Sequence, residues 1–145
     1  MKKLTILFLF TFVGVACHAQ IAKDILIGGH LDLIKTDNDN FFDKAQIGTE
    51  VNYFLTRRFT ATGGLEVWTN DDASLVVGGR WYFMDDAFAR IRGLVGANDL
   101  SIGAGWAKPF NANGNWRFEA IGDFYFRGDI AIRAGIAYLI RKNPN

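Results

Sequence analysis

The sequence predicts an all-β fold, in which one domain forms an eight-stranded antiparallel up-and-down barrel. Apolar and polar residues alternate with a period of two in eight successive stretches of the 145-residue chain, which is the pattern of strands with two unlike faces. Short clusters rich in Asn, Asp and Gly separate the stretches and indicate turns. Half of the residues are hydrophobic, yet no stretch has a helical period, so a sheet has to accommodate the apolar side chains.

The first four strands are expected at residues 24–35, 44–55, 59–69 and 73–83. The first alternates Ile and Leu with Gly, His and Asp, and the second alternates Ile, Val and Tyr with Gln, Glu and Asn. The third sets Phe, Leu and Val against Thr and Glu, and the fourth sets Leu, Val and Trp against Ser, Gly and Arg. Each is followed by a short polar segment, which predicts a change of chain direction.

The last four strands are expected at residues 87–97, 100–110, 116–126 and 130–140. The fifth sets Ala, Ile and Val against Phe and Arg, and the sixth sets Leu, Ile and Trp against Ser and Gly. Asn113-Gly114, a strong hairpin signal, leads to the seventh, in which Trp and Phe oppose Arg, Glu and Asp. The eighth has an Ile-rich face and is long enough to cross a bilayer when tilted, which takes about 9–11 residues. We expect it to close the barrel, because closure removes the exposed edges of the sheet.

The N-terminus predicts an export signal. Two lysines precede an apolar core at residues 4–15, which is too short to span a membrane as a helix. We expect residues 1–19 to be a signal peptide and residues 20–145 to form the barrel domain. Cleavage after Ala19 removes the only cysteine and leaves no disulfide. The alternative is that Cys17, which follows small residues, is lipidated.

Charge and motifs argue against several functional classes. Without the two lysines of the signal, 14 basic side chains remain against 15 acidic ones, a balance that does not predict nucleic-acid binding. His30 and Asp32 share one face of a strand, but a metal site normally needs three or four ligands. No serine lies in a nucleophile motif. We therefore expect no cofactor, no metal and no catalytic residue.

The polar faces of the strands carry both signs of charge in nearly equal number. Side chains fill the interior of a barrel this narrow, and buried ions have to pair, because an unpaired buried charge costs several kcal/mol. A balanced set therefore predicts a polar, packed lumen with the apolar face outside. The candidates for lumenal ion pairs are Asp32, Glu50, Glu66, Arg80, Arg90, Arg92, Arg117, Glu119, Asp123 and Arg133. A soluble barrel of the lipocalin or avidin type is the alternative, with the apolar face turned inward.

Aromatic residues of the apolar faces gather toward both strand ends, with more at the end that carries the chain termini. The larger group contains Tyr53, Phe59, Trp81, Phe83, Trp106, Phe110, Trp116, Phe118 and Tyr138. The smaller contains Phe124 and Phe126, with Phe41 and Phe42. Paired aromatic girdles are typical of membrane barrels, so we expect the barrel to be transmembrane. Lys108 is the one charge expected on the lipid-facing set, at a strand end from which it can reach the membrane surface.

These features resemble the small OmpA-like and OmpX-like eight-stranded barrels of Gram-negative outer membranes. The closing strand also resembles the C-terminal assembly signal of that class, through Arg133, Gly135, Tyr138 and Ile140. It departs from the pattern by matching Ile at the last position and by continuing to residue 145. The resemblance implies an outer-membrane location, contact with outer-membrane lipids, insertion by the outer-membrane barrel assembly machinery, and a monomer.

The predicted function is that of an integral outer-membrane protein with a structural or envelope role and no catalysis. The predicted turns are short apart from residues 36–43, which leaves little surface for adhesion. Three alternatives remain from the residues alone. They are a secreted soluble barrel that binds a small apolar ligand, a narrow channel, and a lipid-modifying barrel enzyme.

Overall fold

The computed structural model describes residues 23–35, 46–68 and 73–142. The expected signal peptide, Cys17, Phe41, Phe42 and the segment 36–43 lie outside the described residues. The strands are β1 (Ile25–Lys35), β2 (Gln46–Phe54), β3 (Phe59–Trp68), β4 (Ala73–Tyr82), β5 (Ala87–Val95), β6 (Asp99–Pro109), β7 (Trp116–Tyr125) and β8 (Ile130–Ile140). No helix among the described residues is long and apolar enough to cross a membrane.

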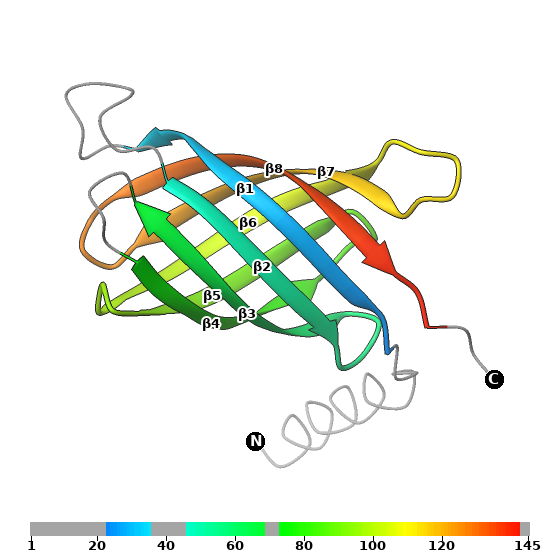
Figure 1. Ribbon diagram of the computed structural model, residues 1–145, viewed down its shortest axis with the longest axis horizontal. Coiled ribbons are helices and arrows are strands. Elements are labelled where there is room, and N and C mark those ends of the chain that lie inside the picture. Colours follow the sequence, from blue (N-terminus) through cyan, green and yellow to red (C-terminus); the bar gives the residue numbers. More distant parts are fainter. Residues whose placement is uncertain (1–22, 36–45, 69–72, 143–145) are drawn as a thin grey trace, which may run out of the picture.

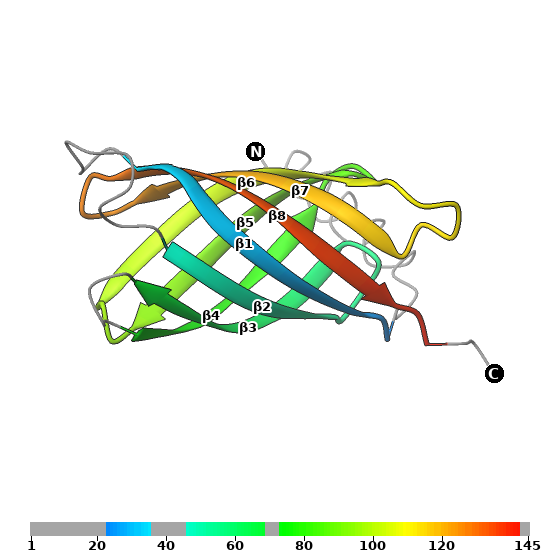
Figure 2. The same ribbon diagram turned by 45° about the horizontal axis from the view of Figure 1, so that its top comes forward.

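The eight strands form one closed barrel in which each strand pairs with its neighbours in sequence and β8 pairs with β1. All eight pairings are antiparallel, and Figures 1 and 2 show the tilted strands winding around a common axis. The predicted all-β, eight-stranded up-and-down barrel is confirmed, including the role of the last strand in closing it. Each strand begins and ends within two residues of its predicted bounds.

We call the end at which β1 begins and β8 finishes the terminal end. The turns that join β2 to β3, β4 to β5 and β6 to β7 also lie there. Gly114 in the last of these turns has a φ of 67°, and Asn98 in the turn between β5 and β6 has a φ of 49°. Both are in the left-handed region that Gly and Asn tolerate best, and the predicted hairpin signal at Asn113-Gly114 lies where a turn is formed.

The apolar face points outward. Ile132, Val77 and Phe118 are 45–55% exposed, as are most large hydrophobic side chains of the strands. Arg133 and Glu119, which alternate with them, are at most 1% exposed. This orientation confirms the predicted one and is opposite to that of a soluble barrel with an apolar interior.

One irregularity interrupts the alternation in β1. Asp32 pairs with Arg133 and Ile34 pairs with Ile132, so that Leu33 is an additional residue in the ladder with β8. Leu33 and Ile34 are consequently both exposed, whereas a strict period of two places Ile34 inside. Such a β-bulge keeps Asp32 opposite Arg133 while the outward apolar surface continues.

The interior is layered. An apolar cluster fills the lumen toward the terminal end, and a smaller one fills the opposite end, with charged and polar side chains between them. The first cluster contains Leu26, Phe54, Tyr82, Phe88, Ala107, Ile121, Ala137 and Leu139. The second contains Leu94, Tyr125 and Ala131, with Ala97 packed against it. The predicted polar lumen therefore occupies the middle of the barrel, with an apolar cluster on each side of it.

Candidate functional site: the lumenal charge network

Every strand except β6 contributes charge to the middle layer, because the inward positions of the alternating pattern carry the ionisable residues. The carboxylates are Asp32, Glu50, Glu66, Glu119 and Asp123, and the cationic groups are Arg80, Arg90, Arg92 and Arg133. His30 from β1 joins them. The side chains in these pairs are at most 3% exposed.

Arg80 links the two carboxylates nearest the terminal apolar layer. Its Nη2 donates to Glu50 Oε2 at 2.8 Å and its Nη1 donates to Glu119 Oε1 at 2.8 Å. The guanidinium carbon lies 4.6 Å from the centre of the Phe88 ring, a cation–π geometry. The second oxygen of Glu119 lies 2.6 Å from His30 Nε2. The layer of charges thus rests directly on the apolar cluster through Phe88.

Arg90 and Arg92 extend the network across the barrel. Arg90 binds Asp123 in a bidentate manner, with Nε at 2.9 Å from Oδ1, and reaches Glu50 Oε1 at 3.2 Å. Arg92 donates to Glu50 and to Asp123, each at 3.1 Å, and also to Glu66. Since both arginines project inward from β5, one strand supplies two cations that bridge carboxylates from β2, β3 and β7.

Arg133 completes the network from the closing strand. Its Nε lies 2.7 Å from Asp32 Oδ1 on the neighbouring strand β1. One terminal nitrogen donates to Glu66, and the other donates to Gln46 Oε1 at 3.1 Å and to the Tyr125 hydroxyl. Gln46 in turn donates its amide to Glu66. The contacts of Arg133 therefore tie β8 to β1, β2, β3 and β7.

The arrangement compensates the cost of burying charge. Glu50 contacts three arginines, Asp123 contacts three, and Glu66 contacts two. Burying an isolated ion costs several kcal/mol, and only multiple good hydrogen bonds offset that cost. Charge-assisted and bidentate contacts of this kind are the strongest polar contacts that side chains make.

Nine of the ten predicted lumenal candidates lie in this network. Arg117, the tenth, is half buried near the terminal end and joins no ion pair among the residues that the structure describes. Sequence reasoning did not identify the pairing of His30 with Glu119, nor the part played by Gln46 and Tyr125. Their inward positions in alternating strands were the available signal, but partners on distant strands cannot be deduced from spacing alone.

The four predicted assembly-signal residues divide between the two faces of β8. Arg133 lies in the network. A Cβ at Gly135 would be 2.4 Å from both the Gly29 carbonyl oxygen and the His30 ring, so glycine leaves space for the neighbouring backbone and for the imidazole. Tyr138 and Ile140 point outward, and the Tyr138 ring meets Trp116 edge-on at 4.9 Å. Recognition of these residues by an assembly machinery stays a prediction.

The predicted aromatic girdle is outward and half exposed at the terminal end. The rings of Phe59 and Trp81 stack at 6.2 Å, and those of Phe110 and Trp116 lie 6.5 Å apart. At the opposite end Phe124 and Phe126 meet edge-on at 6.3 Å. Lys108 is exposed beside this apolar surface, as expected.

Chemically, the site is a filled structural network. Large side chains such as Arg80, Arg92 and Tyr125 occupy the centre of the barrel and are almost fully buried. Within the described ranges, no group of three or more His, Cys, Asp or Glu side chains has the arrangement of a metal site. The contacts are those of mutual neutralisation, and every carboxylate of the layer already has a cationic partner.

Comparison with known proteins shows which solved structures have a similar fold. No family model and no curated protein matches the chain. A solved structure described as a de novo designed transmembrane β-barrel is 16% identical, with a TM-score of 0.65 over 84% of this chain and 99% of that one. A second design, TMB2.3, solved by solution NMR, is also 16% identical, with a TM-score of 0.61 over 85% of this chain and 96% of that one. This chain has the fold of these transmembrane barrels.

Proposed function

We propose that the protein is an integral outer-membrane β-barrel of a Gram-negative cell, with a structural role in the envelope and no catalytic activity. The observation that carries the proposal is the inverted distribution of side chains. A closed barrel turns half-exposed Ile, Val and Phe outward and buries its Arg and Glu side chains in the lumen. A surrounding hydrocarbon phase favours this arrangement, because charged side chains are destabilising on the lipid face, whereas inside the lumen they can pair with one another.

The remaining features of the proposal follow from the sequence and the resemblance. The signal peptide over residues 1–19 directs export, the barrel assembly machinery inserts the chain, and the folded barrel stays monomeric among outer-membrane lipids. The aromatic residues at both ends, such as Trp116 and Phe124, support a membrane-spanning orientation with the barrel axis along the normal. The plugged lumen supports a structural role more than conduction, since four arginines and their carboxylates fill its middle.

The test is whether the folded protein resides in the membrane as a closed barrel. Membranes from cells that express the full chain are washed with alkaline carbonate and with high salt. We expect the protein to stay in the pellet and to require detergent for release. In a detergent gel, the unboiled sample should migrate differently from the boiled one, because a closed barrel resists the detergent until it is heated. Release by carbonate, with identical migration before and after boiling, would refute the proposal.

A further inference from the structure

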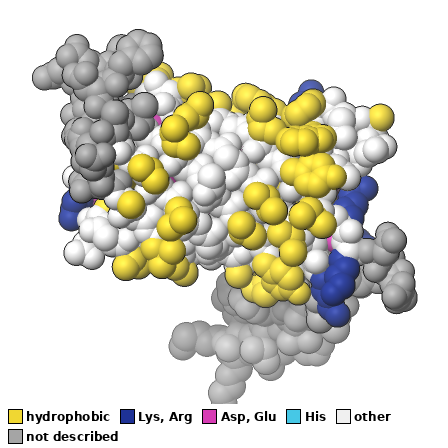
Figure 3. All heavy atoms as spheres, in the orientation of Figure 1, with side chains coloured by type: hydrophobic (Ala, Val, Ile, Leu, Met, Phe, Trp, Pro, Cys, Tyr) yellow, Lys and Arg dark blue, Asp and Glu magenta, His cyan; other side chains and the backbone are white. Residues whose placement is uncertain are grey.

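The two ends of the barrel differ in charge. Seven basic residues lie at or next to the terminal end, namely Lys23, Arg57, Arg58, Lys108, Arg117, Arg141 and Lys142. We call this set the basic rim. Three acidic residues, Asp24, Asp85 and Asp86, lie at the same end. Among the side chains described at the opposite end, one arginine, Arg127, accompanies Asp99 and Asp129. In Figure 3 the Lys and Arg side chains gather mainly where β8 finishes.

Three cations of the basic rim are not neutralised by the barrel itself. Lys108, Arg117 and Arg141 make no ion pair with any residue in the described part of the chain. The Nε atom of Arg117 is buried and has no hydrogen-bond partner there. Asp24 accepts a hydrogen bond from the backbone N–H of Lys142 at 3.0 Å. In contrast to the lumenal arginines, these cations therefore have unused hydrogen-bonding capacity.

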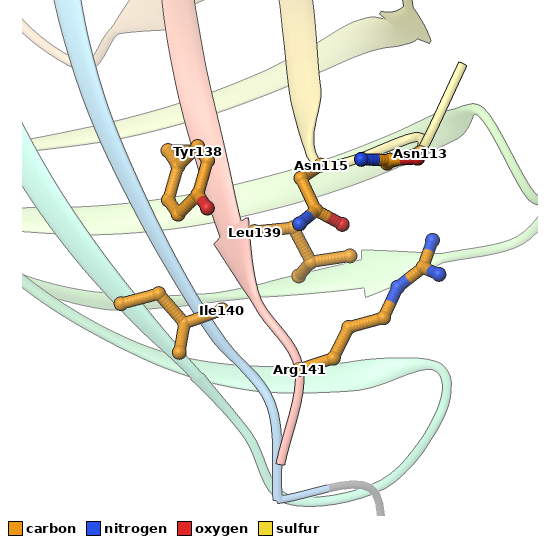
Figure 4. A pocket seen from close by; sticks show the side chains of 6 residues that line it. All are labelled: Asn113, Asn115, Tyr138, Leu139, Ile140 and Arg141. Atoms are coloured by element: carbon orange, nitrogen blue, oxygen red, sulfur yellow. The ribbon is translucent and has the colours of Figure 1, made fainter. Parts of the chain in front are cut away.

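A hollow beside the end of β8 gives this charge a defined site. It has a volume of about 540 Å³ and is lined by Asn113, Asn115, Tyr138, Leu139, Ile140 and Arg141. Figure 4 shows Arg141 and the two asparagines to one side of β8, and Tyr138 and Ile140 to the other. The hollow therefore combines a guanidinium and two carboxamides with an apolar wall.

The turn before β7 holds the polar side of this hollow in place. A Cβ at Gly114 would lie 3.2 Å from Arg141 Nη2, so the guanidinium packs over the turn next to Asn113. The residue is a glycine in the left-handed region, with a φ of 67°, and it gives the guanidinium room. Planar guanidinium groups with adjacent amide donors suit the oxygens of a phosphate, which accept several hydrogen bonds at once.

The aromatic girdle places the hollow at the level of lipid headgroups. Tyr138, which lines the hollow, contacts Trp116 in the girdle, and Trp and Tyr side chains sit at the boundary between hydrocarbon and headgroups. Ile140 continues the apolar surface beside them. Lys108 projects from the lipid-facing side of β6, close to Trp106 and Phe110 in sequence, and its long stem brings the ammonium to the same level.

We propose that the terminal end binds anionic phospholipids, with the phosphate of one headgroup at Arg141, Asn113 and Asn115 and its acyl chain along Tyr138 and Ile140. Lys108, which is exposed on the lipid-facing side of β6, attracts a further anionic headgroup. The proposal rests on the proposed function, because it needs the barrel to be embedded in a bilayer. A lipid fits better than a free polyanion, since the hollow has an apolar wall and Lys108 lies on the lipid-facing surface.

The test measures which lipid contacts the barrel. The full chain with Trp68, the tryptophan at the opposite end, replaced by phenylalanine (Trp68→Phe) is reconstituted into vesicles that contain phosphatidylglycerol or phosphatidylcholine with brominated acyl chains. Quenching of the fluorescence of Trp81, Trp106 and Trp116 then gives the relative binding constant of the two lipids. We expect phosphatidylglycerol to be preferred. Each basic residue near a membrane surface contributes about a fivefold change in binding, so Arg141→Gln should reduce the preference about fivefold, and Lys108→Gln should reduce it in the same direction.

The matched control is Arg127→Gln, which removes an exposed arginine from the opposite end and should leave the preference unchanged. All variants are first checked for heat-modifiable migration, so that only closed barrels are compared. Inorganic phosphate at millimolar concentration should not compete, because it lacks the acyl chain. Equal quenching by both lipids in the Trp68→Phe parent, or an equal loss in Arg127→Gln and Arg141→Gln, would overturn the lipid site alone. Absence of quenching by either lipid would overturn the proposed function with it.

Discussion

A pair of substitutions on the outer surface tests whether hydrocarbon surrounds the barrel. Val77 in β4 and Val67 in β3 are both outward and are 55% and 54% exposed. Val67 pairs with Ala73, the first residue of β4, whereas Val77 lies four residues further along that strand. With a rise of about 3.4 Å per residue and a tilt of about 40°, the two side chains differ in depth by roughly 10 Å. In the proposed membrane orientation, Val77 is therefore near the bilayer midplane and Val67 is near its edge.

Arginine at the two positions should have unequal costs. On the lipid face of a membrane barrel, arginine costs about 2–4 kcal/mol at the midplane and about 0–1 kcal/mol near the interfaces. The expected difference of about 2 kcal/mol lowers the folding equilibrium constant of Val77→Arg roughly 30-fold relative to Val67→Arg. In a water-soluble barrel both positions would be solvated, and exposed substitutions usually change stability by less than about 0.5 kcal/mol.

The assay is reversible denaturant unfolding of the full chain in phosphatidylcholine vesicles, followed by tryptophan fluorescence. The unfolding free energies of wild type, Val67→Arg and Val77→Arg are compared under one set of lipid and salt conditions. Equal and small losses for both variants would refute the idea that Val77 faces hydrocarbon. A larger loss for Val67→Arg would show that the depth assigned to the strands is reversed.

Three further predictions concern the interior. Arg80→Met leaves Glu50 and Glu119 without a shared cation, so it should destabilise the barrel by about 3–5 kcal/mol in the same unfolding assay; Arg117→Met, outside the network, should cost less than about 1 kcal/mol, and equal losses would argue against the network. Gly135→Ala places a methyl group about 2.4 Å from both the Gly29 carbonyl oxygen and the His30 ring and should cost about 1–3 kcal/mol; His30→Ala removes only the ring contact, so the double variant should be less destabilised than the sum of the two single losses, and strict additivity would contradict the ring contact. Folded protein in planar bilayers should be electrically silent, since side chains fill the middle of the lumen; reproducible conductance steps would contradict a sealed interior.

The sequence was sufficient to predict the barrel because apolar and polar residues alternate along its strands with little interruption. A period of two determines which residues share a face, so Arg133 and Ile132 could be assigned to opposite sides without coordinates. The choice of the outer face required a second argument, from the balance of charge on the polar side, and the burial of Arg80 and Glu119 agrees with it. In long, regular strands the same period of two sets both the sequence pattern and the side of the sheet on which each side chain lies.

Features that depend on partners in other strands were beyond the sequence. The bulge at Leu33 arises from the ladder with β8 and leaves no local signature in β1. His30 meets Glu119 although 89 residues separate them. Arg117 occupies an inward position like the other arginines, but it lies one residue after the start of β7 and is therefore at the terminal end of the barrel, away from the charged layer. Position along the barrel axis, which decides whether an inward charge finds a partner, is not encoded by alternation.

The charged layer offers a reason why the barrel has only one register. A shift of any strand by one residue exchanges its faces, and in this barrel it would expose arginines or carboxylates to hydrocarbon while burying Ile and Phe. A shift by two keeps the faces but separates pairs such as Asp32 with Arg133, which are opposite each other in the ladder between β1 and β8. In the proposed membrane setting the outer apolar residues pack only against lipid, so they discriminate poorly between such shifts. The specific pairs within the lumen therefore select the register, and the loss of a single arginine should broaden the folded ensemble as well as weaken it.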